Sequence, residues 1–200
     1  RLLNSLQNQS WPNWSLLFID GPSHAEHRRW LESCCEIDSR LSWLPQDAAE
    51  QGIFGAMNQG FAQASPTDWL LFWGSDDWAP GPDVLAKAIA AIESSARRPD
   101  LIVCRGRYVD PSSGTFRRSS VFQAAGSLES IDYRRALMLG STPPHQATLI
   151  GPGARRRLAR YHDGFRLSGD LDYFLQLCLC TDLMVQCLNL ELVHMSLSGV

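Results

Sequence analysis

Apolar runs alternate with helix-periodic segments through the first hundred residues of the chain. Continuous apolar runs predict buried strands at 14–19, 41–44 and 68–73. Apolar residues at helical spacing predict helices at 2–6, 24–33 and 53–64, and from Gly81-Pro82-Asp83 onward, where a proline stands near the first turn. This alternation predicts an α/β fold with a mostly parallel sheet flanked by helices, whose ligands bind beyond the carboxyl ends of the strands.

The second half of the chain has a more mixed pattern. A strand at 101–108, a turn at 110–114 and a returning strand to Phe122 predict a hairpin. Further segments predict helices at 130–139, 155–161 and 169–180, and an extended segment at 145–150. Because no internal repeat or low-complexity linker interrupts the chain, residues 1–200 are expected to form a single domain.

Composition narrows the class of protein. The 200 residues, 44% of them hydrophobic, are enough for one sizeable core. A formal net charge of −3 and scattered basic residues argue against a nucleic-acid partner. The six cysteines stand mostly among apolar residues and are expected to be reduced. With no apolar run of the roughly 20 residues that span a membrane and no signal-peptide pattern, the sequence indicates a cytoplasmic location.

The adjacent carboxylates Asp76 and Asp77 are the sharpest chemical signal. They follow the apolar run that ends at Trp73, and two neighbouring carboxylates repel each other unless a cation or hydrogen-bond donors offset their charge. Such hard oxygen ligands suit Mg²⁺ or Mn²⁺, which normally share their coordination with substrate phosphates. The same pair is also expected in a simple turn or helix cap, so the pair alone leaves both interpretations open.

The wider context of this pair resembles a known family. The segment Gln51-Gly52-Ile53-Phe54-Gly55-Ala56-Met57-Asn58-Gln59-Gly60, followed by a strand that ends in Ser75-Asp76-Asp77, resembles inverting glycosyltransferases of family 2 that build bacterial surface polysaccharides. The resemblance includes Ile19-Asp20-Gly21-Pro22-Ser23, His145-Gln146-Ala147-Thr148 and the segment from Asp163 to Leu177, and so covers nearly the whole chain in the family's order.

The resemblance implies a GT-A fold, in which 1–100 binds the nucleotide sugar and 101–200 shapes the acceptor site. By similarity, Asp77 would hold a divalent ion, Mn²⁺ or Mg²⁺, and Asp76 would contact the ribose or share the metal. Asp20 would lie at the base and ribose, and Asp170 would be the general base. The implied reaction moves a sugar, with inversion, from a nucleotide diphosphate donor of the UDP-sugar type to a glycan or lipid-linked acceptor.

Three features depart from the family pattern. Members usually begin with a strand and loop that touch the base, and no such strand precedes Arg1; we therefore expect a fragment of a longer protein that lacks its first strand. Gly21 stands where many members have a second aspartate, and Gly74 stands where a further aspartate usually precedes the acidic pair. These differences concern recognition of the nucleobase. They leave in place the carboxylate expected to bind the metal, Asp77, and the expected general base, Asp170.

Other candidate residues have simpler explanations beside the functional ones. Asp170 follows a glycine at a helix start and could be an N-cap, and Asp172 cannot face the same way on a helix, so only one of the two is expected to be catalytic. His145 could contact the acceptor or be structural. The basic run Arg155-Arg156-Arg157 could approach an anionic lipid or pyrophosphate at the inner face of a membrane, or could form a solvated helix face.

Two other functions remain open on the sequence alone. A nucleotide-binding or glycan-binding module could keep this fold without turnover, and Gly74 together with the missing first strand hints at that. A sugar nucleotidyltransferase also uses acidic residues and Mg²⁺ on a doubly wound sheet. The segments around His145 and Asp170 favour glycosyl transfer over both.

Overall fold

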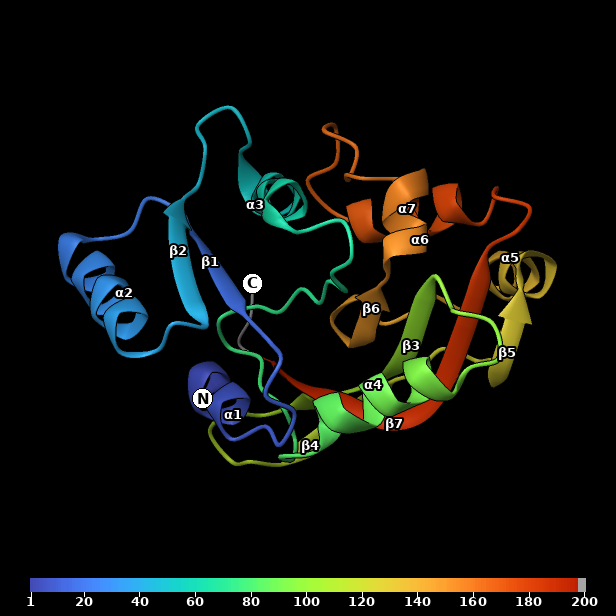
Figure 1. Ribbon diagram of the computed structural model, residues 1–200, viewed down its shortest axis with the longest axis horizontal. Coiled ribbons are helices and arrows are strands. Elements are labelled where there is room, and N and C mark those ends of the chain that lie inside the picture. Colours follow the sequence, from blue (N-terminus) through green and yellow to red (C-terminus); the bar gives the residue numbers. More distant parts are fainter. Residues whose placement is uncertain (198–200) are drawn as a thin grey trace.

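A computed structural model describes residues 1–197 of the chain as an α/β structure (Figure 1). The α-helices are α1 (Leu2–Gln7), α2 (Ala25–Ile37), α3 (Gly52–Gln63), α4 (Val84–Ser94), α5 (Ser130–Met138), α6 (Pro152–Arg157) and α7 (Gly169–Leu177), with a 3-10 turn η1 (His145–Ala147). The strands are β1 (Leu16–Asp20), β2 (Leu41–Pro45), β3 (Leu101–Val109), β4 (Phe116–Ser120), β5 (Gly126–Glu129), β6 (Thr148–Ile150) and β7 (Met184–Ser196).

The strands form two sheets, and the larger one is mixed. β1 and β2 pair in parallel with α2 beside them, at one side of Figure 1. The five-stranded sheet has the order β4-β3-β7-β5, and β6 also pairs with β3. Only β3 and β7 are parallel there, because β4 returns through a hairpin and both β5 and β6 join antiparallel. The α/β class is confirmed, whereas the expected mostly parallel sheet is corrected to a mixed one.

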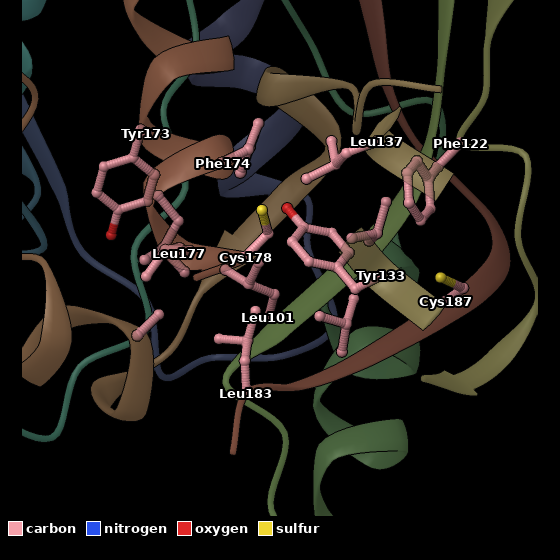
Figure 2. Close-up of a cluster of buried hydrophobic side chains, with 14 of the residues drawn as sticks. Leu101, Phe122, Tyr133, Leu137, Tyr173, Phe174, Leu177, Cys178, Leu183 and Cys187 are labelled. Carbon is pink, nitrogen blue, oxygen red and sulfur yellow. The ribbon is translucent and has the colours of Figure 1, made fainter. Parts of the chain in front are cut away.

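Strand β3 separates two hydrophobic cores. Successive side chains of a strand point to opposite faces of its sheet. Leu101 and Val103 accordingly join a core with α5 and α7, and Ile102 and Cys104 join a second core with α4. Figure 2 shows the first of these cores, where Tyr133 of α5 is fully buried. The helices therefore cover both faces of the sheet, as the alternating sequence pattern predicts.

Two predicted extended segments differ from the structure. Residues 68–73 are not a strand of either sheet, since only Leu70 pairs, by an isolated bridge to Ile150. The segment then runs beside η1. Two prolines without N–H groups precede this turn, and the turn itself is not extended, so this part of the chain cannot pair with residues 71–73 as a strand. For the same reason the predicted extended segment at 145–150 is extended only over β6.

Most of the remaining helices and strands lie within a few residues of their predicted positions. The strands β5 and β7 were not predicted, although β7 pairs with both β3 and β5 in the larger sheet. The predicted hairpin is present as β3 and β4, and all six cysteines are free, as expected. No helix within residues 1–197 has the length and apolar character that a membrane crossing requires.

Candidate functional site

The acidic pair lies in a tight turn that Asp77 itself closes. The Gly74 N–H donates to Asp77 Oδ2 at 2.8 Å, and the Asp77 N–H donates back to the Gly74 carbonyl at 3.1 Å. A Cβ at position 74 would lie 2.9 Å from Asp76 Oδ1 and 3.4 Å from Asp77 Oδ2. The glycine that departs from the family pattern thus lets both carboxylates approach the same stretch of backbone.

Burial gives Asp77 an unusual electrostatic state. The residue is only 4% exposed, and no Lys, Arg or His among residues 1–197 forms an ion pair with it. Burial, opposed by the backbone hydrogen bond from Gly74 and reinforced by the charge of Asp76, raises the pKa of Asp77 to about 6. A buried carboxylate with a negative neighbour and no cationic partner is stabilised when a cation binds beside it.

The donor set is compatible with a divalent ion that also binds phosphate. Residues 1–197 contain no group of three or more His, Cys, Asp and Glu side chains arranged to hold a metal on their own. Mg²⁺ commonly takes one or two protein carboxylates and completes its octahedron with water and substrate phosphates. Asp76 and Asp77 fit that pattern, because they would supply hard oxygen ligands to such an ion and would leave its other positions to water and phosphate.

Hydrogen bonds on both sides hold the acidic turn against the rest of the fold. After the turn, Trp78 and His194 of β7 exchange backbone hydrogen bonds at 3.0 and 2.8 Å. Before it, Trp73 Nε1 donates to the Gln146 carbonyl of η1 at 2.7 Å. Trp73 is therefore partly structural, and the acidic turn is tied directly to the segment that contains His145.

Asp170 lies in the first turn of α7. The N-cap is Ser168, which adopts a left-handed conformation with φ 60°, so the interpretation of Asp170 as the N-cap is wrong. Asp172 Oδ2 accepts a hydrogen bond from Gln176 Nε2 at 2.6 Å. Residues two positions apart on a helix face different directions. The Asp172 carboxylate is therefore directed away from Asp170 and is hydrogen bonded within α7.

A buried histidine packs against α7, the helix that contains Asp170. His145 Nε2 and the Tyr161 hydroxyl are hydrogen bonded at 2.6 Å, and the His145 ring stacks on Phe72 with centroids 5.9 Å apart. Burial lowers the pKa of His145 to about 4, and the negative charge of Asp170 opposes that shift. Burial also raises the pKa of Tyr161 well above its usual range. The imidazole is therefore neutral at pH 7.

These contacts, together with the packing of Phe174 on His145, join the acidic turn to α7, the helix whose first turn contains Asp170. Phe72 packs on His145, Trp73 bonds η1, and the acidic pair follows a few residues later. Asp20, by contrast, lies at the end of β1, where its Oδ1 accepts a hydrogen bond from the Ser23 hydroxyl at 2.6 Å. No hydrogen bond or ion pair within residues 1–197 links it to the other three carboxylates, so its place at the nucleotide stays a prediction.

The arginine run is built into the fold. Arg155 donates to the backbone carbonyls of Ala64, Ser65 and Asp68, at the C-terminal end of α3, where cations are favourable. Arg157 pairs with Asp182 at 2.7 Å and lies 3.5 Å from Asp100. Because two of the three guanidinium groups are engaged in this way, a lipid or pyrophosphate contact by the whole run is not supported, and only Arg156 is exposed.

Sequence reasoning missed two residues of this region. Asn58 is buried, and its amide exchanges hydrogen bonds with the Tyr161 backbone: Tyr161 N–H donates to Oδ1 at 2.7 Å, and Nδ2 donates to the Tyr161 carbonyl at 3.1 Å. A polar residue among apolar positions of α3 was the only signal for Asn58.

A hollow of about 240 Å³ lies beside the Asn58–Tyr161 hydrogen bonds. It is lined by Leu158, Arg160, Tyr161, His162, Asp163 and Gln176.

Comparison with known proteins assigns the chain to a family. The model of glycosyl transferase family 2 matches residues 1–157, and the chain belongs to this family. The match includes Asp20, Asp76 and Asp77 and ends before Asp170. The predicted family is therefore confirmed.

Individual relatives agree with this assignment. The chain is 28% identical to the uncharacterized glycosyltransferase Rv1514c of Mycobacterium tuberculosis, over 88% of this chain and 62% of that protein. It is 27% identical to a PGL/p-HBAD biosynthesis glycosyltransferase of Mycobacterium bovis, over 86% of this chain and 60% of that protein. The chain thus spans about three fifths of the length of these curated relatives.

A solved structure agrees in fold. Crystallised S. aureus TarS in complex with UDP superimposes with a TM-score of 0.75 at 17% identity, over 98% of this chain and 56% of that one. Similarity at this level of identity shows the fold alone, and it confirms the predicted GT-A architecture.

Proposed function

We propose that the protein transfers a sugar from a nucleotide diphosphate donor, of the UDP-sugar type, to a glycan or lipid-linked acceptor, with inversion. The observation that carries the proposal is the link between the acidic turn and α7, whose first turn contains Asp170, through Trp73, η1 and the packing of Phe174 on His145. Family membership supports glycosyl transfer over nucleotidyl transfer, and the UDP in the TarS complex supports a uridine nucleotide. Biosynthetic action in the cytoplasm, at the inner face of the membrane, is part of the same proposal.

Each carboxylate has a separate task in this mechanism. Asp77 would hold a divalent ion, Mn²⁺ or Mg²⁺, and Asp76 would contact the ribose or share that ion. The ion would neutralise the negative charge that builds on the departing nucleoside diphosphate. Asp20 contacts the ribose and base. Asp170 accepts the proton of the acceptor hydroxyl as that oxygen attacks the anomeric carbon, in a single displacement. Residues 1–100 bind the donor, and residues 101–200 shape the acceptor site.

Nucleotide binding tests the donor half of this proposal. Calorimetric titration of the full chain with UDP is expected to show tighter binding in Mn²⁺ than in chelator. Asp77→Asn, which keeps an oxygen to accept the Gly74 N–H, should abolish that difference. Asp83→Asn is the matched control, because Asp83, at the N-cap of α4, is half exposed and forms an ion pair with Lys87 of that helix.

Two outcomes would count against the proposal. UDP binding of equal affinity with and without metal would favour a non-catalytic nucleotide-binding module. Failure to release UDP from any of a panel of UDP-sugars, in the presence of Mn²⁺ and saccharide acceptors, would contradict transfer from that donor class. The same panel, repeated with other nucleotide sugars, would then identify the base.

A further inference from the structure

Strand β4 forms an edge of the larger sheet and is rich in arginine. Within residues 1–197 it pairs only with β3, in the order β4-β3-β7-β5, so its outer edge is open. Phe116, Arg117 and Arg118 of this strand are all exposed. None of them has a role in the proposed mechanism.

The hairpin that contains β4 concentrates positive charge. Residues 105–121 contain four arginines and a single acidic residue, Asp110, in a chain whose formal net charge is −3. Arg105 and Arg118 are exposed, and no ion pair within residues 1–197 includes either of them. Arg118 lies over the Tyr108 ring instead, with its Cζ atom 4.4 Å from the ring centroid. Because a stacked guanidinium keeps N–H groups at its rim, both arginines are available to an anion.

The other two arginines hold the hairpin in shape. Arg117 pairs with Asp110, in the turn before β4, at 3.0 Å. Arg107 forms an ion pair with Glu191 of β7 and lies over the Phe116 ring, with its Cζ atom 4.4 Å from the ring centroid. Phe116 is nevertheless 56% exposed. The hairpin thus presents an aromatic side chain and two free cations on an edge that its own contacts hold in place.

This edge is connected to the acidic turn. Phe116 packs on His194 of β7 with ring centroids 5.3 Å apart, and His194 exchanges backbone hydrogen bonds with Trp78, the residue after the acidic pair. Charged side chains on an edge strand can serve only to prevent pairing with other sheets. An exposed aromatic ring does not serve that purpose, whereas apolar groups beside arginines are typical of surfaces that bind the interface of an anionic bilayer.

We propose that the β4 edge, defined by Arg105, Phe116 and Arg118, docks the protein on the surface of an anionic lipid bilayer. The proposal rests on the proposed function, which takes place at a membrane, and it names the surface that meets that membrane. Arg105 and Arg118 bind headgroup phosphates, and the Phe116 ring enters the region between the headgroups and the acyl chains. Because His194 connects this edge to the acidic turn, docking holds the donor site near the lipid surface.

Co-sedimentation with vesicles tests the role of charge. The full chain should bind vesicles of phosphatidylcholine and phosphatidylglycerol in equal parts, and should bind pure phosphatidylcholine far more weakly. Arg105→Gln combined with Arg118→Gln should lower the affinity for the anionic vesicles on the order of 20-fold, since each arginine near such a surface contributes about 5-fold. Arg97→Gln combined with Arg98→Gln is the matched control, because it removes two exposed arginines elsewhere. An equal loss in both double variants would show that only net charge matters and would overturn the proposal.

Phe116→Ser tests the apolar contact. Its affinity for the anionic vesicles should fall about 10-fold, because no ring then enters the interface. Ile131→Ser is the control, since Ile131 of α5 is an apolar residue that is 72% exposed, and this variant should bind like the parent. A melting curve for each variant checks that it is folded. Parental binding by Phe116→Ser, with loss of binding in Ile131→Ser, would place the docking surface on α5 and overturn the proposal.

Titration with UDP separates this proposal from the proposed function. In Mn²⁺ the variant with Arg105→Gln and Arg118→Gln should bind UDP as tightly as the parent. If UDP fails to bind the parent while vesicle binding depends on Arg105 and Arg118, the proposed function is wrong and the docking surface stands. If the parent binds UDP but neither kind of vesicle, the docking surface is wrong.

Discussion

The Gly74 N–H donates to the Asp77 carboxylate at 2.8 Å, and this bond decides the shape of the acidic turn. It holds Asp77 inward, where it is buried, and leaves Asp76 partly exposed. The two adjacent carboxylates therefore differ in environment, although the sequence presents them as equivalents. Their roles in ion binding should differ accordingly, with Asp77 fixed in place and Asp76 freer to adjust to the ligand.

Gly74→Ala tests the dependence of the site on this turn. The added Cβ would lie 2.9 Å from Asp76 Oδ1, closer than ordinary van der Waals contact, so a carboxylate has to move. We expect Mn²⁺-dependent UDP affinity, measured by calorimetry, to fall on the order of 10-fold. Gly81→Ala is the control, since a Cβ there meets Asp83 Oδ1 at an ordinary 3.6 Å. Equal UDP affinity in both variants would show that the turn is not part of the ion site.

Tyr133→Phe tests the packing of the larger core. The Tyr133 hydroxyl is fully buried and points toward Cys178 (Figure 2), yet it has no hydrogen-bond partner within residues 1–197. Removing an unsatisfied buried hydroxyl is neutral or favourable, whereas removing a bonded one costs about 1 kcal/mol. The melting temperature should therefore stay level or rise in Tyr133→Phe.

The same melting experiment has an internal reference. Tyr173→Phe, which loses its hydrogen bond to the Leu158 carbonyl, should melt about 2–4 °C lower than the parent. If Tyr133→Phe is instead the less stable of the two, the Tyr133 hydroxyl has a partner such as a buried water molecule.

Local sequence patterns predicted the helices and strands whose apolar spacing lies within one segment of the chain. The helix α3 and the strand β1 follow directly from apolar spacing, and both are present at the expected positions. Residues 68–73 show the limit of that reasoning. Their apolar character suits a buried strand, but strand formation also needs a partner edge, and the neighbouring chain turns at η1 instead. A pattern within one segment cannot specify the backbone geometry of another segment that lies 75 residues away.

The residues of the candidate site also differ in whether a local sequence pattern could reveal them. The acidic pair and Asp170 are visible in the sequence, because aspartates at element ends are a local signal. The contacts between Asn58, Tyr161 and His145 are not, since Asn58 and Tyr161 are 103 residues apart and each is unremarkable in its own segment. The Arg155 bonds to the end of α3 were missed for the same reason. Only the folded chain shows which polar residues are used to hold it together.

The two aspartates of α7 should respond differently to the same substitution. Asp170→Asn keeps the size of the side chain and removes the basic oxygen, so kcat should fall on the order of 10²–10⁴-fold with little change in donor affinity. Asp172→Asn should stay within a few-fold of the parent, because Asp172 bonds Gln176 in its own helix. Steady-state kinetics at saturating donor, with a melting curve for each variant, would check this. An inactive, folded Asp172→Asn beside an active Asp170→Asn would move the base to Asp172.

The burial of His145 should make part of the fold's stability depend on pH. Its pKa is lowered from 6.5 to about 4 by burial, so between these values the unfolded chain binds a proton that the folded chain does not. Stability is therefore full above about pH 6.5 and is lost as the pH falls toward 4. Urea unfolding at pH 7, 6 and 5 should show that His145→Gln loses less free energy of unfolding than the parent, with a difference on the order of 1–2 kcal/mol. His162→Gln is the control, because His162 is exposed and should leave the parental pH dependence intact. Parallel pH profiles for the parent and His145→Gln would mean that the pKa of His145 is the same in the folded and the unfolded chain, and would contradict its lowered value in the folded protein.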